Sequence, residues 1–312
     1  MKMEEYKGMQ ACILENEKLE VRIHPGLGGK VASLVFKPAG FEAAAQTNWE
    51  HRRPMEEEPR FSDFDSSGLD EVFPTINECS LDGQDAGFYY PDHGEVWSTA
   101  MDCEEEEGAL KMSFESPKNP YRYEKKLQLK DSSLRWQFRI TNTGDRAFPC
   151  LFALHGLMRY EPDMRLLYPS SVKEFLNVYT SPELGEDGTV FQVEDGTTGH
   201  AGSLRYDFRQ VPPPEPMTRI KYYVNGPIQK GVCGYEYPSQ GVRCILRFPA
   251  DKLPYLGFWL TAGRYRGEYN CAWEPSSGFY DSTEIASKNG TLTRLQPGET
   301  VIYDLSLSFS MI

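Results

Sequence analysis

The sequence predicts an all-β protein, built as a large antiparallel β-sandwich, and three observations support this fold class. Hydrophobic and polar residues alternate with a period of two in several segments, as they do in strands that bury one face and expose the other. The chain contains 27 glycines and 22 prolines, which favour turns between short strands. Segments with helical periodicity are scarce, so we expect helix in less than about a third of the chain.

The alternation is clearest at residues 134–141, where every second residue from Leu134 to Ile140 is hydrophobic. The segments 242–248 and 301–309 repeat it. Asn-Thr-Gly-Asp at 142–145 and Gln-Pro-Gly-Glu at 296–299 predict turns. Gly-Leu-Gly-Gly at 26–29 lies between two strand-like runs, and we interpret it as a hairpin turn because no helix start follows it. A short helical turn is expected near Val172–Leu176.

We interpret residues 1–312 as a single domain, because large all-β units often reach this length as one piece. The proline-rich stretch 211–216 is then an extended loop within the domain. A domain linker is the alternative, but the chain beyond it is short for a second domain.

Charge limits the classes of partner that the chain can have. Lys and Arg number 33 against 46 Asp and Glu, which gives a net charge of −13. Such a surface repels phosphate backbones and anionic lipid headgroups, so we expect neither a nucleic acid nor a membrane partner. The expected partner is a small molecule that is neutral or is held locally by a few basic side chains.

Cysteine usage and the N-terminus indicate a cytoplasmic location. The seven cysteines are scattered and form no Cys-x-x-Cys pair, so we expect reduced thiols, several of them buried, instead of disulfides. The first residues lack the apolar core of a signal peptide. No apolar run is long enough to span a bilayer.

We expect no metal and no cofactor. None of the five histidines pairs with another at the short spacing of a helical metal site. An acidic stretch could bind calcium through loop oxygens, but its spacing does not match a calcium-binding helix-loop-helix, and we interpret it as a surface loop. Its members are Asp63, Asp65, Asp70 and Glu71.

Three segments place a proton-transfer group at a turn or a strand end. Pro91–Trp97 holds His93 in a turn, Leu151–Gly156 ends an apolar strand with His155, and Glu274 stands before Pro275 at the end of another strand. From spacing alone, a structural role is the more common one for a histidine at a strand end and for a glutamate before a proline.

Together with other segments, these three resemble the aldose 1-epimerase, or galactose mutarotase-like, family. The resemblance covers nearly the whole chain, and its motifs follow the order expected for the family. The segments that carry it are 23–34, Gly68–Ile76, Pro91–Ser98, Phe152–Gly156, Trp273–Gly278 and Leu295–Thr300.

The resemblance implies a large antiparallel β-sandwich with a sugar cleft on one concave sheet. It implies that the enzyme interconverts the α and β anomers of a free aldose by general acid–base catalysis. The family's catalytic base corresponds to Glu274 and its two active-site histidines to His93 and His155. Glu274 would take the proton of the C1 hydroxyl and His155 would protonate the ring oxygen, while His93 would position that oxygen or share the acid role.

Further sugar contacts are expected at four positions. Asp70 and Glu71 would hydrogen-bond other hydroxyls, and Trp97 and Trp259 would stack on the sugar face, with a core role as the alternative for either tryptophan. The chain lacks the Asn-Arg pair that precedes the first histidine in the best-known members, and its second histidine stands in His-Gly-Leu. No particular sugar is therefore implied.

Two other functions fit the same scaffold. One is a non-catalytic carbohydrate-binding protein, and the other is a glycosidase or lyase that uses two carboxylates. The epimerase hypothesis makes a specific demand, because it requires His93, His155 and Glu274 to converge on one cleft although they lie far apart in the sequence.

Overall fold

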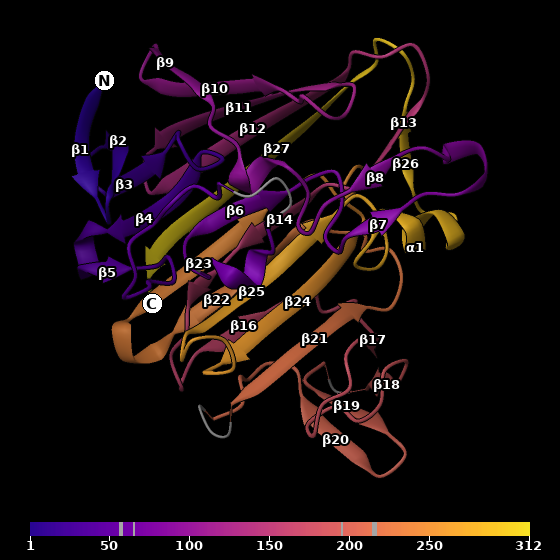
Figure 1. Ribbon diagram of the computed structural model, residues 1–312. Helices are drawn as coiled ribbons and strands as arrows, with labels where there is room; N and C mark the ends of the chain where they lie inside the picture. Colours follow the sequence, from indigo (N-terminus) through magenta and orange to yellow (C-terminus); the bar gives the residue numbers. More distant parts are fainter. Residues whose placement is uncertain (56–58, 65, 195, 214–216) are drawn as a thin grey trace.

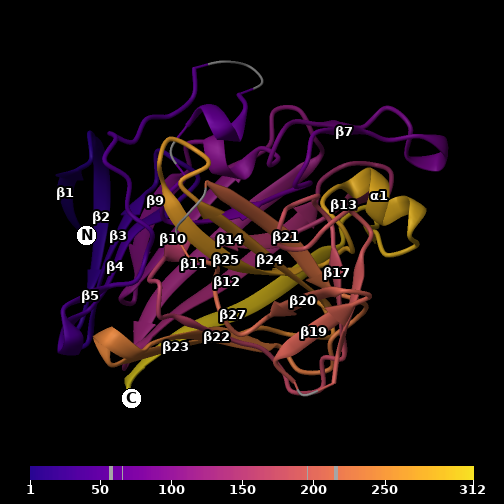
Figure 2. The same cartoon turned by 90° about the horizontal axis from the view of Figure 1, so that it is seen from below.

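The computed structural model describes the whole chain except residues 56–58, 65, 195 and 214–216, the last three within the proline-rich stretch (Figure 1). Half of the chain is strand, and the α-helix of the described part is the six-residue α1 (Thr283–Lys288). Two large antiparallel sheets make up the fold (Figures 1 and 2). The predicted all-β class and the low helix content are confirmed.

The larger sheet has 15 strands within the described residues and contains segments from both ends of the chain. In spatial order its strands are β1 (Lys2–Tyr6), β2 (Met9–Glu15), β3 (Leu19–His24), β4 (Lys30–Phe36), β6 (Leu69–Val72), β14 (Ala153–Gly156), β25 (Tyr269–Ser276), β24 (Tyr255–Ala262), β21 (Thr218–Val224), β17 (Glu174–Asn177), β18 (Val190–Val193), β19 (Thr198–Ala201) and β20 (Leu204–Asp207), with β5 (Phe41–Glu42) beside β4 and β15 (Met158–Arg159) beside β25.

The second sheet has eight strands in the described part of the chain. In order they are β16 (Arg165–Leu167), β22 (Val232–Tyr237), β23 (Val242–Arg247), β27 (Thr300–Met311), β12 (Ser133–Asn142), β11 (Tyr121–Lys130), β10 (Ala109–Glu115) and β9 (Asp102–Glu106). Two-stranded ribbons lie outside the large sheets, namely β7 (Cys79–Ser80) with β8 (Tyr89–Tyr90) and β13 (Phe148–Cys150) with β26 (Thr293–Leu295).

The hydrophobic core lies between the two large sheets. Phe152, just before β14, packs at a tilt against Phe138 of β12 and stacks on Tyr303 of β27, with ring centroids 5.1 and 4.7 Å apart. Trp273 of β25 is 1% exposed and its indole N–H donates to Gly234 O of β22. These contacts follow from the alternation seen in the sequence, because the hydrophobic face of each strand points toward the opposite sheet.

The local expectations had mixed outcomes. The glycine-rich segment 26–29 is the turn between β3 and β4, as predicted. The helical turn expected at 172–176 is wrong, because most of that segment belongs to β17. There, Phe175 is fully buried and stacks on Phe208 at 4.1 Å, so packing overrides the local helix signal.

All seven cysteines are free thiols, and six of them are buried. The described residues contain no helix with the length and hydrophobicity needed to cross a membrane.

Candidate functional site

The centre of the larger sheet carries one row of functional side chains on the face that points away from the core. Strand register aligns Tyr223 with Gly257 and Gly257 with Glu274. Ala153 of β14 pairs with Ser276 of β25. Because the two strands are antiparallel, moving two residues forward on β14 and two back on β25 places His155 opposite Glu274. His155 in turn pairs with Asp70 on β6. Because side chains opposite one another share a face of the sheet, residues from five strands meet in this row.

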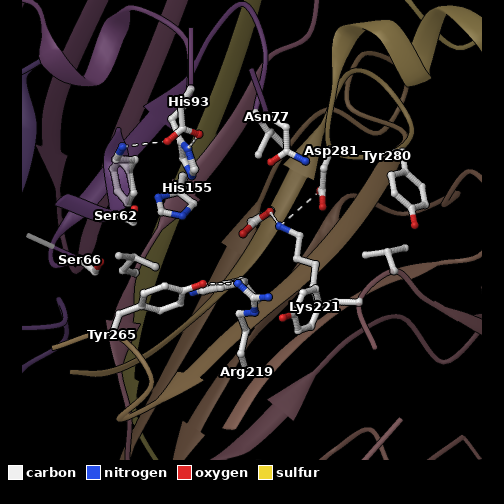
Figure 3. A pocket seen from close by; sticks show the side chains of 18 of the residues that line it. Ser62, Ser66, Asn77, His93, His155, Arg219, Lys221, Tyr265, Tyr280 and Asp281 are labelled. Atoms are coloured by element: carbon white, nitrogen blue, oxygen red, sulfur yellow. Dashed lines mark hydrogen bonds and ion pairs between the residues drawn. The ribbon is translucent and has the colours of Figure 1, made fainter. Parts of the chain in front are cut away.

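A cavity of about 400 Å³ lies over this part of the sheet (Figure 3). His93, His155 and Glu274 all line it, so the expected convergence of these three residues on one cleft is what the structure shows. Loops and strands from most of the chain contribute to the wall. The remaining lining residues are Phe61, Ser62, Ser66, Ile76, Asn77, Asp92, Leu157, Val178, Tyr179, Asp187, Arg219, Lys221, Trp259, Tyr265, Tyr280 and Asp281.

His93 is held in a tight turn above the sheet. Its φ is 59°, a left-handed conformation that is uncommon outside glycine, and its backbone N–H donates to Ile76 O at 2.6 Å. The next residue, Gly94, packs so closely against the backbone that a Cβ there would lie 1.9 Å from Phe73 O. A larger residue would therefore displace the turn and the imidazole with it.

The ring of His93 has fixed partners on two sides. Its Nδ1 lies 2.7 Å from Asp92 Oδ1, and its plane stacks on Phe61 with centroids 4.2 Å apart. Asp92 also accepts the backbone N–H of Phe61 at 2.8 Å. Although burial opposes ionisation of Asp92, the hydrogen bond and charge of His93 bring the pKa of this carboxyl below its ordinary value. The carboxylate therefore orients the ring.

His155 is in a different electrostatic environment. It is 6% exposed and its ring lies edge-on to that of His93, with centroids 5.4 Å apart. Its Nδ1 is buried and has no hydrogen-bond partner among the described residues. Burial, followed by the positive charges of His93, Lys221 and Lys30, lowers the pKa of His155 well below its usual range. The imidazole is therefore neutral at neutral pH.

Glu274 belongs to a buried cluster in which the Lys221 ammonium pairs with two carboxylates, those of Glu274 and Asp281. The Lys221 ammonium contacts Glu274 Oε2 and lies 3.6 Å from Asp281 Oδ1, while Glu274 Oε1 is buried without a hydrogen-bond partner among the described residues. Burial raises the pKa of Glu274, and the charge of Lys221 opposes this rise. Burial would lower the pKa of Lys221, but Asp281 and Glu274 hold it above its ordinary value.

Gly257 makes room for this cluster. It separates Tyr223 from Glu274 in the row, and a Cβ on it would lie 3.0 Å from Cε1 of the Tyr223 ring. The ring therefore lies close over the glycine, where its hydroxyl donates to Asp281 Oδ1 at 2.5 Å. Burial, with the negative charges of Asp281 and Glu274, keeps the pKa of Tyr223 well above its ordinary value, so the phenol remains a donor.

Three of the expected sugar contacts lie outside the cavity lining. Asp70 and Glu71 belong to the buried strand β6, where they form ion pairs with Lys30 at 3.3 Å and Lys125 at 2.8 Å. Their interpretation as a surface loop is wrong, because Lys30 of the neighbouring β4 and Lys125 of β11 in the opposite sheet compensate the buried carboxylates. Asp65, in the same acidic stretch, is outside the described residues.

The two tryptophans have different surroundings. Trp97 is 3% exposed, packs edge-on against Phe61 at 5.1 Å, and donates its indole N–H to Asp92 O at 3.1 Å. It therefore supports the turn that carries His93, which is the core alternative considered for it. Trp259 lines the cavity, where its ring lies 6.0 Å from that of Tyr265.

Sequence reasoning missed the cationic side of the cavity. Arg219 and Lys221 alternate with Ile220 and Tyr222 along β21, and the latter two are fully buried in the core. This period of two was present in the sequence and could have indicated that both cations share a face. Within the described residues, no group of three or more His, Cys, Asp or Glu side chains could hold a metal ion.

Comparisons with known proteins identify the fold to which this chain is similar. No family model and no curated protein matches the chain. Among solved structures, the Slr1438 protein of Synechocystis sp. PCC 6803 aligns over 100% of both chains with a TM-score of 0.71 and 17% identity. A galactose mutarotase-like protein from Lactobacillus casei ATCC 334 covers 96% of this chain and 100% of its own, with a TM-score of 0.68 and 16% identity.

A third solved structure, provisionally described as an aldose 1-epimerase from Escherichia coli K12, covers 97% of this chain and 99% of its own, with a TM-score of 0.68 and 17% identity. The chain therefore has the galactose mutarotase-like fold, as the sequence resemblance implied. At these identities the likeness is one of fold alone.

Proposed function

We propose that the cavity binds a free aldose and interconverts its α and β anomers by general acid–base catalysis. The observation that carries this proposal is the meeting of an unpartnered carboxylate oxygen, Glu274 Oε1, with two imidazoles in one cavity of a mutarotase-like fold. Anomer exchange requires a proton acceptor at the C1 hydroxyl and a donor at the ring oxygen. It requires no redox step.

Glu274 is the base of this mechanism. Its free oxygen takes the proton of the C1 hydroxyl as the C1–ring oxygen bond breaks, and the bond electrons leave with the ring oxygen, which gains a proton. Rotation about C1–C2 and reversal of both transfers then give the other anomer. Burial makes Glu274 a stronger base than an exposed carboxylate, and Lys221 opposes its protonation in the resting enzyme.

Of the two histidines, we assign the role of the acid to His93. The sequence-based hypothesis gave this role to His155, but burial and nearby positive charges lower the pKa of this imidazole well below its usual range, which disfavours the imidazolium form that acts as the acid. The hydrogen bond between Asp92 and Nδ1 orients the His93 ring, and we assign the transfer of the ring-oxygen proton to this ring. Neutral His155 then hydrogen-bonds the substrate and positions it between acid and base.

Polarimetry of freshly dissolved α-anomers across a panel of aldoses tests the proposal. Glu274→Gln keeps the size of the side chain but cannot accept the proton, so the rate should fall roughly 10²–10⁴-fold while sugar affinity changes little. The matched control is Glu71→Gln, another buried carboxylate paired with a lysine but outside the cavity lining, which should leave the rate per folded molecule unchanged.

Two outcomes would replace the proposal. A wild-type protein that binds sugars but accelerates the mutarotation of none of them would be a carbohydrate-binding protein. Release of a reducing sugar from a glycoside would indicate the glycosidase alternative, in which Glu274 acts with a second carboxylate.

A further inference from the structure

Arg219 is a charged group in the cavity without a compensating carboxylate. Its Nη1 donates to the hydroxyl of Tyr265, and its guanidinium carbon lies 3.4 Å from the centroid of the Tyr179 ring. No carboxylate among the described residues forms an ion pair with it, and its Nε is buried without a hydrogen-bond partner in that part of the chain. The two tyrosines therefore hold the guanidinium in place, while Nε and Nη2 keep their donor capacity.

This arrangement differs from that of the other cavity cation. Lys221, two residues away on the same face of β21, is compensated by Glu274 and Asp281. A buried donor without an acceptor costs free energy, and native proteins rarely leave one unpaired. Since the protein carries a net charge of −13, carboxylates to pair with Arg219 are plentiful elsewhere in the chain. The missing acceptor is thus best explained as part of a ligand.

We propose that Arg219 binds an anionic substituent of the sugar, so that the substrate is an aldose carrying a carboxylate or a phosphate. The inference rests on the proposed function, because it names the substrate class of the same cavity. The Nε–Nη2 edge of a guanidinium matches the two oxygens of either oxyanion. The tyrosine contacts fix that edge before the ligand arrives, which lowers the entropy lost on binding.

The position of Arg219 suits the far end of a sugar. It precedes Tyr223 by four residues on β21, and Tyr223 is in register with Glu274, so the two backbones are offset by about 13 Å along the strands. Two extended side chains and a sugar ring can bridge this offset. Figure 3 shows Arg219 and Tyr265 on one side of the cavity and His93, Asn77 and Asp281 on the other. The anion would therefore bind away from the groups that act at C1.

Isothermal titration with three ligands tests the inference without depending on catalysis. D-Glucuronate supplies the carboxylate, D-glucose 6-phosphate supplies the phosphate, and D-glucose is the neutral reference. We expect at least one anionic sugar to bind roughly 10- to 100-fold more tightly than glucose, the factor that one hydrogen-bonded charge contributes. The sugar with the larger gain identifies the anion.

Variants separate a specific site from general attraction. Arg219→Gln should remove the preference for the anionic sugar and leave glucose affinity nearly unchanged, whereas Arg219→Lys should keep part of the preference because it keeps the charge. Arg264→Gln is the matched control, since this exposed arginine is absent from the cavity lining and changes the net charge equally. The midpoint of thermal unfolding of each variant checks that it is folded.

The results distinguish failure of the anion-binding inference from failure of the proposed catalytic function. If neither anionic sugar binds more tightly than glucose, or if Arg219→Gln weakens all three ligands equally, the inference is wrong even where polarimetry detects epimerisation. If an anionic sugar binds through Arg219 but no aldose is epimerised, the anion site stands and the proposed catalytic function fails.

Discussion

Lys221→Met is the substitution that most directly tests how the cavity maintains its base. Methionine keeps much of the length of the lysine but removes the ammonium that contacts Glu274. Burial then raises the pKa of Glu274 without opposition from this charge, so the carboxyl holds its proton to a higher pH than in the unmodified protein. Because the base must be ionised to accept the C1 proton, the acidic limb of the pH–rate profile should move to higher pH.

Stability should change as well, with a defined sign. Removing one member of a buried ion pair typically costs about 3–5 kcal/mol, and protonation of Glu274 reduces this cost. A carboxyl whose pKa is raised by folding holds its proton more tightly in the folded state, so it stabilises the fold at pH below the unfolded pKa. That contribution is lost as the pH rises through the folded pKa. Lys221→Met should therefore lose more stability at pH 8 than at pH 5.

The assays are urea unfolding at both pH values and mutarotation rates measured by polarimetry from pH 5 to 9. Lys125→Met is the matched control, because Lys125 forms a buried ion pair with Glu71, where burial raises the pKa to about 7. It should lose a comparable amount of stability without shifting the pH–rate profile. An unchanged acidic limb in Lys221→Met would refute the coupling of this lysine to the catalytic base.

Three further predictions concern other parts of the site. Asp92→Asn removes the carboxylate that orients the His93 ring, so polarimetry should show a rate loss of up to the roughly 10²–10⁴-fold that one positioned acid contributes, with sugar affinity retained. Gly257→Ala should push the Tyr223 ring away from Asp281 and lower stability by about 1–3 kcal/mol in urea unfolding, as overpacking does. Exhaustive chelation should leave both sugar binding and mutarotation unchanged; a loss restored by calcium or zinc would contradict metal-independent chemistry.

The fold could be predicted because its strands carry their own signal. Leu134, Trp136, Phe138 and Ile140 alternate in the sequence and are all buried in β12. Such a pattern depends only on which face of a strand meets the core. It fails where both faces are covered, as on β6, whose four residues Leu69–Val72 are all buried and include two carboxylates. The acidic residues there look exposed in the sequence because the lysines that compensate them come from other strands.

The candidate site could be predicted only in part, for the same reason. Family resemblance identified His93, His155 and Glu274, but no local pattern could show that Lys221 contacts Glu274. That contact depends on the placement of β24 between β21 and β25. Long-range register of this kind is set by the whole sheet and leaves no trace in the segment around either residue.

The contacts that long-range strand register creates also explain why a lysine lies beside the proposed base. A carboxylate exposed to water is a weak base, whereas one buried without a partner would bind a proton and could not accept another. In this cavity burial raises the pKa of Glu274, which makes the carboxylate more basic. Lys221 opposes that rise, so the carboxylate can remain charged before the substrate binds. The negative charge of Asp281, which accepts a hydrogen bond from the Tyr223 hydroxyl, raises the pKa values of both Lys221 and Glu274. The reactivity of Glu274 therefore depends on three other side chains, those of Lys221, Asp281 and Tyr223, that only the folded chain brings together.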